Sequence, residues 1–139
     1  MLGPAPRVKL GWADRAEGSH SPGLMNAIET TEDAILNGRV RLRQPARGYR
    51  VNVDTILLAA AVEAVDGARL LEAGCGVGGA LLAVAARNEQ TSLVGVERDQ
   101  NIAAIARENV AINAMSQRVS IVTGDVLERS RNIGLFDGV

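Results

Sequence analysis

The chain has 139 residues, of which 47% are hydrophobic and 22% are charged, and its formal net charge of −1 points to neither a nucleic acid nor a membrane partner. This length suits one globular domain with a core of its own. The single cysteine, Cys75, excludes an intrachain disulfide and a cysteine-based metal cluster. The apolar run 56–62 is too short to span a bilayer, and the amino terminus lacks the order of a signal peptide, so we expect a cytoplasmic protein.

Residues 1–28 are predicted to be a disordered leader, because they hold three of the four prolines and show no apolar periodicity. Met25 stands just before the first regular pattern, so it is expected to be an alternative start. Residues 29–53 predict a β-hairpin, in which Asn37-Gly38 forms a two-residue turn.

The second strand of this hairpin carries arginines on alternate positions: Arg39, Arg41 and Arg43. The segment 38–53 holds five arginines and no acid, whereas residues 54–139 have a net charge of −4. The arginine face is a candidate contact for the phosphates of an RNA. The alternative is a charged edge strand that prevents aggregation, and the sequence leaves both open.

Residues 54–139 predict strands and helices in alternation, which is typical of an α/β fold with a parallel sheet. A first helix is capped by Asp54 or Thr55 and is closed by Asp66-Gly67. After it, strands are predicted over 69–73, 92–96 and 119–122, and a further strand begins at 136–139. Helices are predicted over 79–87 and 99–114.

A glycine-rich turn follows the strand 69–73, with the sequence Glu72-Ala73-Gly74-Cys75-Gly76-Val77-Gly78-Gly79. Glycines are needed where a backbone leaves a strand, turns sharply and lets a ligand come close. The free N–H groups at the start of the next helix point toward the same place. We therefore expect a ligand at this turn.

Two classes of ligand use such a turn. The spacing of Gly74, Gly76 and Gly79 fits a dinucleotide, with Glu97 about twenty residues on to hold a ribose. The spacing of Glu72, Gly74, Gly76 and Gly78 fits S-adenosylmethionine. A carboxylate at Glu72 would repel a diphosphate by about 4 kcal/mol at ~4 Å and an effective dielectric of ~20. S-adenosylmethionine carries an ammonium and a sulfonium but no phosphate, so it is favoured, and an NAD(P)-binding oxidoreductase domain is the weaker alternative.

Two more acids follow the next two predicted strands. Glu97 can accept both hydroxyls of a ribose, and Asp125 can accept from the exocyclic amine of an adenine. Acids after three consecutive parallel strands fall on one edge of the sheet. Taken alone, Glu97 is as often a solvated acid, and Asp125 is more often a helix cap. Cys75 is expected to contribute a backbone amide and no thiol chemistry.

Three segments resemble the class I S-adenosylmethionine-dependent methyltransferases: 70–78, Val96-Glu97 and Gly124-Asp125. More narrowly, the segment 44–58 is similar to the tRNA adenine-N6 methyltransferases that modify the position beside the anticodon of a valine tRNA, within the methyltransferase small-domain group. The resemblance covers about residues 32–139. It implies a Rossmann-like fold over 54–139, S-adenosylmethionine as the cofactor, a tRNA substrate, and neither a metal nor a membrane.

The resemblance also implies roles for single residues. Glu72 and the glycine turn would bind the methionine moiety, Glu97 the ribose and Asp125 the adenine, while Arg50 and Asp54 match a segment that packs over the methionine end. The expected cofactor residues are therefore Arg50, Asp54, Glu72, Gly74, Cys75, Gly76, Gly78, Glu97 and Asp125.

In the family, the fourth strand leads into an Asn-Pro-Pro-aromatic motif that grips the target amine and stacks on a flipped base. We expect this motif beyond Val139, so no catalytic residue is assigned within the chain. The expected sheet is partial, with strand order 3-2-1-4 and a bare apolar flank that favours self-association. A fragment that binds S-adenosylmethionine but cannot transfer the methyl group is the alternative.

Overall fold

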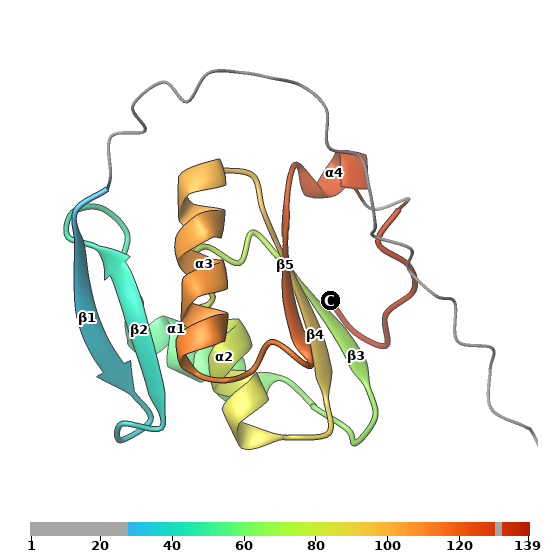
Figure 1. Ribbon diagram of the computed structural model, residues 1–139. Coiled ribbons are helices and arrows are strands. Elements are labelled where there is room, and N and C mark those ends of the chain that lie inside the picture. Colours follow the sequence, from blue (N-terminus) through green and yellow to red (C-terminus); the bar gives the residue numbers. More distant parts are fainter. Residues whose placement is uncertain (1–27, 130–131) are drawn as a thin grey trace, which may run out of the picture.

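The computed structural model describes residues 28–129 and 132–139 (Figure 1). The predicted leader, apart from Ile28, and the alternative start at Met25 lie outside these residues. The elements of the described chain are β1 (Thr30–Ile35), β2 (Val40–Pro45), α1 (Val53–Ala61), β3 (Arg69–Ala73), α2 (Gly79–Arg87), β4 (Ser92–Glu97), α3 (Gln100–Ile112), β5 (Val119–Thr123) and α4 (Val126–Arg129).

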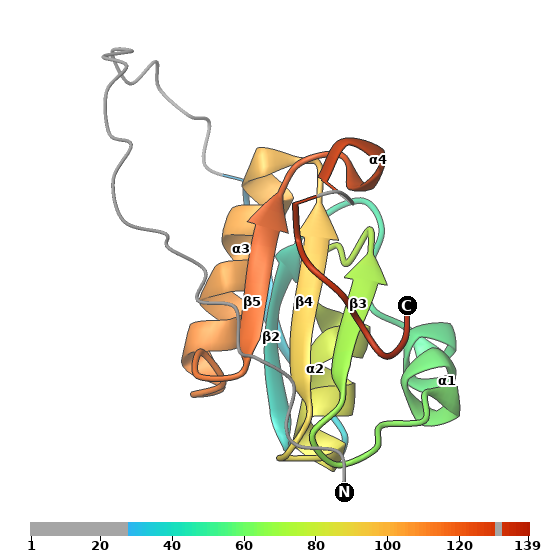
Figure 2. The same cartoon turned by 90° about the vertical axis from the view of Figure 1, so that its right-hand side faces the viewer.

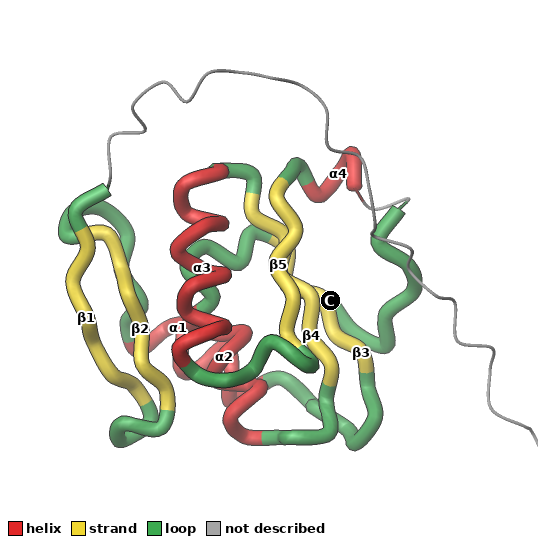
Figure 3. Tube along the Cα trace, in the orientation of Figure 1, coloured by secondary structure: helices red, strands yellow, loops and turns green. Residues whose placement is uncertain are grey.

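The elements form three layers, which Figures 1 and 3 show side by side. The hairpin β1-β2 covers one side of helices α2 and α3, and the parallel sheet β3-β4-β5 covers the other. Val40 and Leu42 on the inner face of β2 are fully buried and belong to the same core as Leu81 and Leu82 of α2. The predicted α/β class with an amino-terminal hairpin is thereby confirmed.

The parallel sheet has the order β3-β4-β5, with Arg69 of β3 opposite Ser92 of β4. The segment predicted as a further strand at 136–139 reaches β3 but forms only a parallel bridge, between Leu70 and Gly138 (Figure 2). In this bridge, the Leu71 N–H donates to the Gly138 carbonyl at 3.0 Å. The bridge lies on the edge of β3 that β4 does not occupy.

The turn of the hairpin is longer than the predicted two residues. Ile35 pairs with Val40, so residues 36–39 form the loop between the strands. Leu36, Asn37 and Gly38 all have positive φ angles, of 53°, 56° and 83°. Asparagine and glycine tolerate this left-handed backbone well, and Leu36 adopts it at some cost in strain.

Helix α1 begins after Asn52, whose side-chain oxygen accepts from the backbone N–H groups of Asp54 (3.0 Å) and Thr55 (3.4 Å). The prediction that Asp54 or Thr55 caps this helix is therefore wrong. The helix also ends at Ala61, well before Asp66-Gly67, and the Arg87 guanidinium of α2 donates to the carbonyls of Ala60 and of the capping residue Val62.

Asn109 of α3 and Asn113, which caps the end of this helix, bond the edge of β2 that lies opposite β1. The Asn109 amide accepts from Arg43 N–H (2.7 Å) and donates to Arg43 C=O (2.9 Å). Asn113 does the same with Arg41, at 2.9 and 2.7 Å. Asn109 and Asn113 are four helical residues apart, a rise of about 6 Å, and Arg41 and Arg43 are two strand residues apart, about 6.6 Å, so the spacing of the asparagines matches that of the arginines. Helix α3 thus supplies the hydrogen bonds that a neighbouring strand would make.

Candidate ligand site at the glycine turn

A cavity of about 620 Å³, called here the glycine-turn cavity, opens between the loop after β2, the glycine turn and the end of β4. Five of the residues predicted to bind the cofactor line it: Asp54, Glu72, Cys75, Gly76 and Glu97. Ligand pockets for small molecules and cofactors usually hold about 300–1,000 Å³, so a nucleoside fits.

The glycine turn has a backbone that residues with a Cβ rarely adopt. Gly74, Gly76 and Gly78 have φ angles of +74°, +54° and +86°. Their amides bond within the protein: the N–H groups of Gly74 and Cys75 donate to the Val96 carbonyl, at 2.8 and 3.0 Å. The Gly78 N–H donates to the Cys75 carbonyl at 2.9 Å. The turn therefore does not present a row of free amides, which a phosphate-binding loop needs.

Glu97 ties the glycine turn to the end of β4. One carboxylate oxygen accepts from the Gly76 N–H at 3.0 Å and the other from the Asp99 N–H at 2.8 Å. Each oxygen has a further lone pair. The carboxylate is therefore held in place at the wall of the cavity and can still accept hydrogen bonds from ligand hydroxyls.

Glu72 lies at the wall of the cavity with its carboxylate largely buried. Its Oε2 atom has no hydrogen-bond partner in the described part of the chain. Burial raises the pKa of this carboxyl from 4.5 to about 7, and a hydrogen bond from the Leu81 backbone opposes the rise. Because a buried carboxylate without a cationic partner is costly, Glu72 marks a place for a positively charged ligand group.

Cys75 is a packing residue of the turn. Its pKa is raised to about 12 by burial and by the nearby carboxylates of Glu72 and Glu97, so the thiol stays protonated at neutral pH. A Cβ built on Gly95 of β4 would lie only 2.6 Å from the Cys75 sulfur. This contact explains the glycine in the middle of a buried strand.

Several residues predicted to bind the cofactor lie outside the cavity wall. Arg50 donates to Asp33 (2.5 Å) and to the Pro45 carbonyl (3.0 Å), so it holds the hairpin to the loop after β2. Asp125 is exposed, and its carboxylate accepts from the Leu127 N–H at 2.8 Å, which caps α4. Gly74 and Gly78 shape the turn but do not line the cavity. Arg50 and Asp125 thus have structural contacts within the chain, and neither lines the cavity.

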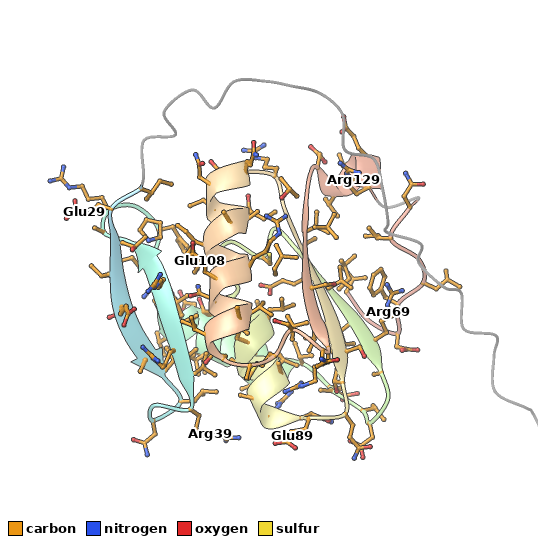
Figure 4. All side chains as sticks on the ribbon, viewed as in Figure 1. Glu29, Arg39, Arg69, Glu89, Glu108 and Arg129 are labelled. Carbon is orange, nitrogen blue, oxygen red and sulfur yellow. The ribbon has the colours of Figure 1, made fainter. Side chains whose placement is uncertain are left out.

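Two of the three arginines of the predicted face are paired with acids of the same chain, and the third bonds a backbone carbonyl. Glu32 of β1 bonds both Arg41 (3.4 Å) and Arg43 (3.1 Å), and Arg43 also bonds Glu108 of α3 at 3.2 Å. Figure 4 shows Glu108 on α3 beside the hairpin, and Arg39, which donates to the Ala86 carbonyl, near the end of α2. Strand β2 is covered on both edges, so it is not the exposed edge strand of the alternative prediction.

Two features of the site were not predicted. Asn109, which is fully buried, donates to the Val77 carbonyl of the glycine turn at 2.9 Å and so joins the turn to β2. Gly79 allows a close approach, because a Cβ there would overlap the Val51 side chain and lie 3.3 Å from Thr55 Cγ2. The loop before α1 therefore packs directly on the start of α2.

A second cavity, of about 920 Å³, runs along β3 between α1, α2 and the carboxyl-terminal segment, and its lining is mainly apolar. Glu72 also borders it. Within residues 28–129 and 132–139, no group of three or more His, Cys, Asp or Glu side chains is arranged to hold a metal ion. None of the described helices has the length and apolar character needed to cross a membrane.

The sequence model of the family described as "methyltransferase small domain" matches residues 48–138. No curated protein matches the chain. Many solved structures do match, and three of them illustrate the fold.

The structure of P. horikoshii TYW2 in complex with MeSAdo is 19% identical, has a TM-score of 0.59, and aligns over 76% of this chain and 38% of its own. The carboxyl-terminal domain of precorrin-6Y C5,15-methyltransferase from Rhodobacter capsulatus is 18% identical, with a TM-score of 0.58, over 65% of this chain and 48% of its own. The SAM-dependent methyltransferase from Agrobacterium tumefaciens is 21% identical, with a TM-score of 0.57, over 78% of this chain and 38% of its own. The chain thus spans less than half the length of each of these proteins, and at these identities the likeness concerns the fold.

Proposed function

The chain belongs to the methyltransferase small domain family. On this premise we propose that it is a methyltransferase that binds S-adenosylmethionine in the glycine-turn cavity. The observation that carries the proposal is the buried Glu72 carboxylate, which has an oxygen without a partner among the described residues and borders that cavity. S-adenosylmethionine supplies an activated methyl group on its sulfonium. Its ammonium would be the cationic partner of the Glu72 carboxylate, which has none among the described residues.

The remaining contacts fit a nucleoside with an amino-acid side chain. Glu97 is held by two backbone N–H groups and keeps acceptor capacity toward ribose hydroxyls. The cavity wall is otherwise largely apolar, with Val51, Val77 and Ile102 available to contact a ring system. A protein of the same fold, P. horikoshii TYW2, is solved with the S-adenosylmethionine analogue MeSAdo, which supports the choice of ligand.

A dinucleotide fits this site poorly. A diphosphate would meet the Glu72 carboxylate, whose Oε2 has no partner among the described residues, and the amides of Gly74, Cys75 and Gly78 are already bonded within the protein. Both effects oppose an anion at the turn. The oxidoreductase alternative is therefore not favoured.

We further propose an adenine N6 of a tRNA as the methyl acceptor, in the cytoplasm. The support is the similarity of the segment 44–58 to that subgroup of methyltransferases. In the subgroup, an Asn-Pro-Pro-aromatic motif holds the target amine. Methylation of unmodified tRNA by the protein, with mapping of the modified base, tests the substrate.

Calorimetry of the chain with S-adenosylhomocysteine, and separately with NAD⁺, tests the ligand. One molecule of S-adenosylhomocysteine per chain is expected to bind, and NAD⁺ is expected to give no heat of binding. Glu72→Gln serves as the site control, because it removes the charge and preserves the shape. Tighter binding of NAD⁺ than of S-adenosylhomocysteine would overturn the proposal.

A further inference from the structure

The loop after β2 is tied together at its base. The Gln44 side chain, only 3% exposed, accepts from the Val51 N–H at 2.7 Å and donates to Asp33 at 2.9 Å. Arg50 closes the same loop by donating to the Pro45 carbonyl at 3.0 Å. These bonds fix the two ends of the loop and leave its tip, Arg47 to Tyr49, projecting at the glycine-turn cavity.

The tip residues have little structural role of their own. Tyr49 is 76% exposed, and its hydroxyl makes one long contact, 3.4 Å from the Thr55 hydroxyl. Arg47 is exposed and has no hydrogen bond or ion pair within the described chain. Both side chains nevertheless line the cavity. An aromatic ring on a braced loop at a cavity mouth is available to contact a ligand, because packing does not use it.

The charge of the cavity differs between its wall and its rim. Asp54, Glu72 and Glu97 make the lining acidic, and among the described lining residues Arg47 is the only cation. An anionic group is therefore favoured only beside Arg47, and a flat uncharged group is favoured on the face of Tyr49. A nucleic acid strand offers both groups, because each flat base is followed along the backbone by an anionic phosphate.

We propose that Arg47 and Tyr49 form a nucleotide-binding lip, at which a base of a single-stranded RNA stacks on Tyr49 while a neighbouring phosphate binds Arg47. The lip rests on the proposed function, because it would present an RNA acceptor to the glycine-turn cavity. Stacking on an aromatic ring tolerates any base, so the lip selects single-stranded nucleic acid and leaves the choice of base to other residues. An acidic peptide would engage Arg47 but leave the ring of Tyr49 unused.

The test measures binding of a fluorescein-labelled, ten-nucleotide single-stranded RNA and, separately, of S-adenosylhomocysteine, to the full chain. Tyr49→Ala is expected to weaken RNA binding about tenfold or more, and Tyr49→Phe is expected to stay within about twofold of wild type. Arg47→Ala is expected to reduce the dependence of log K on log salt concentration by about 0.7 for a single strand. Both alanine variants are expected to bind S-adenosylhomocysteine as the wild type does. Leu57→Ala is the matched control, since Leu57 is exposed but lines neither cavity.

The lip is overturned if Tyr49→Ala binds the RNA as tightly as wild type, if the wild type does not bind the RNA, or if Tyr49→Ala loses S-adenosylhomocysteine and RNA equally. The last result would make Tyr49 a cofactor contact. A wild type that fails to bind S-adenosylhomocysteine, but whose RNA binding depends on Tyr49, would contradict the proposed function and leave the lip standing. Preferential binding of an acidic peptide would replace RNA as the partner.

Discussion

Replacing Glu72 by glutamine is expected to stabilise the ligand-free fold and to weaken ligand binding at the same time. The Glu72 carboxylate is buried at the wall of the glycine-turn cavity, and one of its oxygens has no hydrogen-bond partner in the described chain. Glutamine has nearly the same shape but no charge. The substitution therefore removes the desolvation cost together with the attraction for a cationic ligand.

The pH dependence follows from the raised pKa. Glu72 titrates near 4.5 in an unfolded chain and near 7 in the folded protein. Between these values the folded protein holds a proton that the unfolded chain has released, so the free energy of unfolding falls as pH rises and becomes level above about 7. At about 1.4 kcal/mol per pKa unit, the full loss by pH 8 is about 3 kcal/mol. Glutamine does not titrate, so the variant lacks this loss.

Ligand binding is expected to show the opposite trend. An ammonium placed beside Glu72 favours the ionised carboxylate, so the wild type should bind S-adenosylhomocysteine more tightly as pH rises from about 6 to 8. The variant should bind it more weakly at pH 8 and lack this part of the pH dependence. Binding of 5′-methylthioadenosine, which has no amino-acid group, should differ little between the two proteins.

Urea unfolding of both proteins at pH values from 5 to 8, with calorimetry of the two ligands at the same pH values, measures these effects. The stability advantage of Glu72→Gln should grow with pH over this interval. A constant difference in the free energy of unfolding would show that Glu72 does not titrate as inferred. An unchanged affinity for S-adenosylhomocysteine at pH 8 would remove Glu72 from the ligand site.

Two further substitutions test the supports of the site, and a third tests the arginine face. Asn109→Ala should lower the free energy of unfolding by about 2–3 kcal/mol and weaken S-adenosylhomocysteine binding. Asn113→Ala loses matching bonds to β2 but none to the glycine turn, so it should leave that affinity unchanged. Equal affinities in both variants would contradict this role of Asn109. Gly79→Ala should weaken S-adenosylhomocysteine binding in calorimetry by displacing the Val51 side chain. Adding Val51→Ala should restore part of the affinity, and no rescue would reject the steric cause. Glu32→Gln should steepen the salt dependence of RNA binding, because it frees Arg41 and leaves Arg43 with Glu108 as its one remaining acid among the described residues. An unchanged slope would exclude Arg41 from RNA contact.

The elements of the parallel sheet could be predicted from the sequence because their signals are local. The strand 69–73 and the helix 79–87 occur as predicted, since a short apolar run, a glycine turn and a second apolar run specify them. The helix predicted over 99–114 occurs as α3, Gln100–Ile112, and Asp99 lies before it as the cap that accepts from the N–H groups of Asn101 and Ile102. The hydrophobic period was sufficient to predict these elements, whereas the helix caps were not predicted correctly.

Pairs of side chains from different elements were harder to predict, because a local sequence pattern does not indicate which distant residues come into contact. The arginines of β2 looked unpaired since their own segment has no acid, and Glu32 and Glu108 come from β1 and α3. Arg50 was expected near a ligand, and its bond to Asp33, seventeen residues earlier, was not predicted. Such pairings depend on register and packing, which become known only with the fold.

The three acids at the ends of three strands illustrate the same limit within the site. Their place at one edge of the sheet follows from parallel topology, but their roles do not. Glu97 is held by backbone N–H groups, Asp125 caps α4, and Glu72 keeps an oxygen without a partner among the described residues. The topology therefore locates side chains that are candidates to bind a nucleoside. The hydrogen bonds that each side chain already makes within the protein decide which of them can still accept from a ligand.

The glycine turn is held from directions that a minimal nucleotide-binding unit would lack. The buried Asn109 links its Val77 carbonyl to β2, and Gln44 of β2 holds the Val51 N–H beside Gly79. The hairpin thus reaches the turn twice, once through α3 and once through the loop that forms the rim of the cavity. Hydrogen bonds between buried polar groups fix their relative positions more strictly than apolar packing does. The hairpin therefore sets the shape of the ligand site through these bonds. A change at the hairpin should therefore alter ligand affinity without touching the ligand.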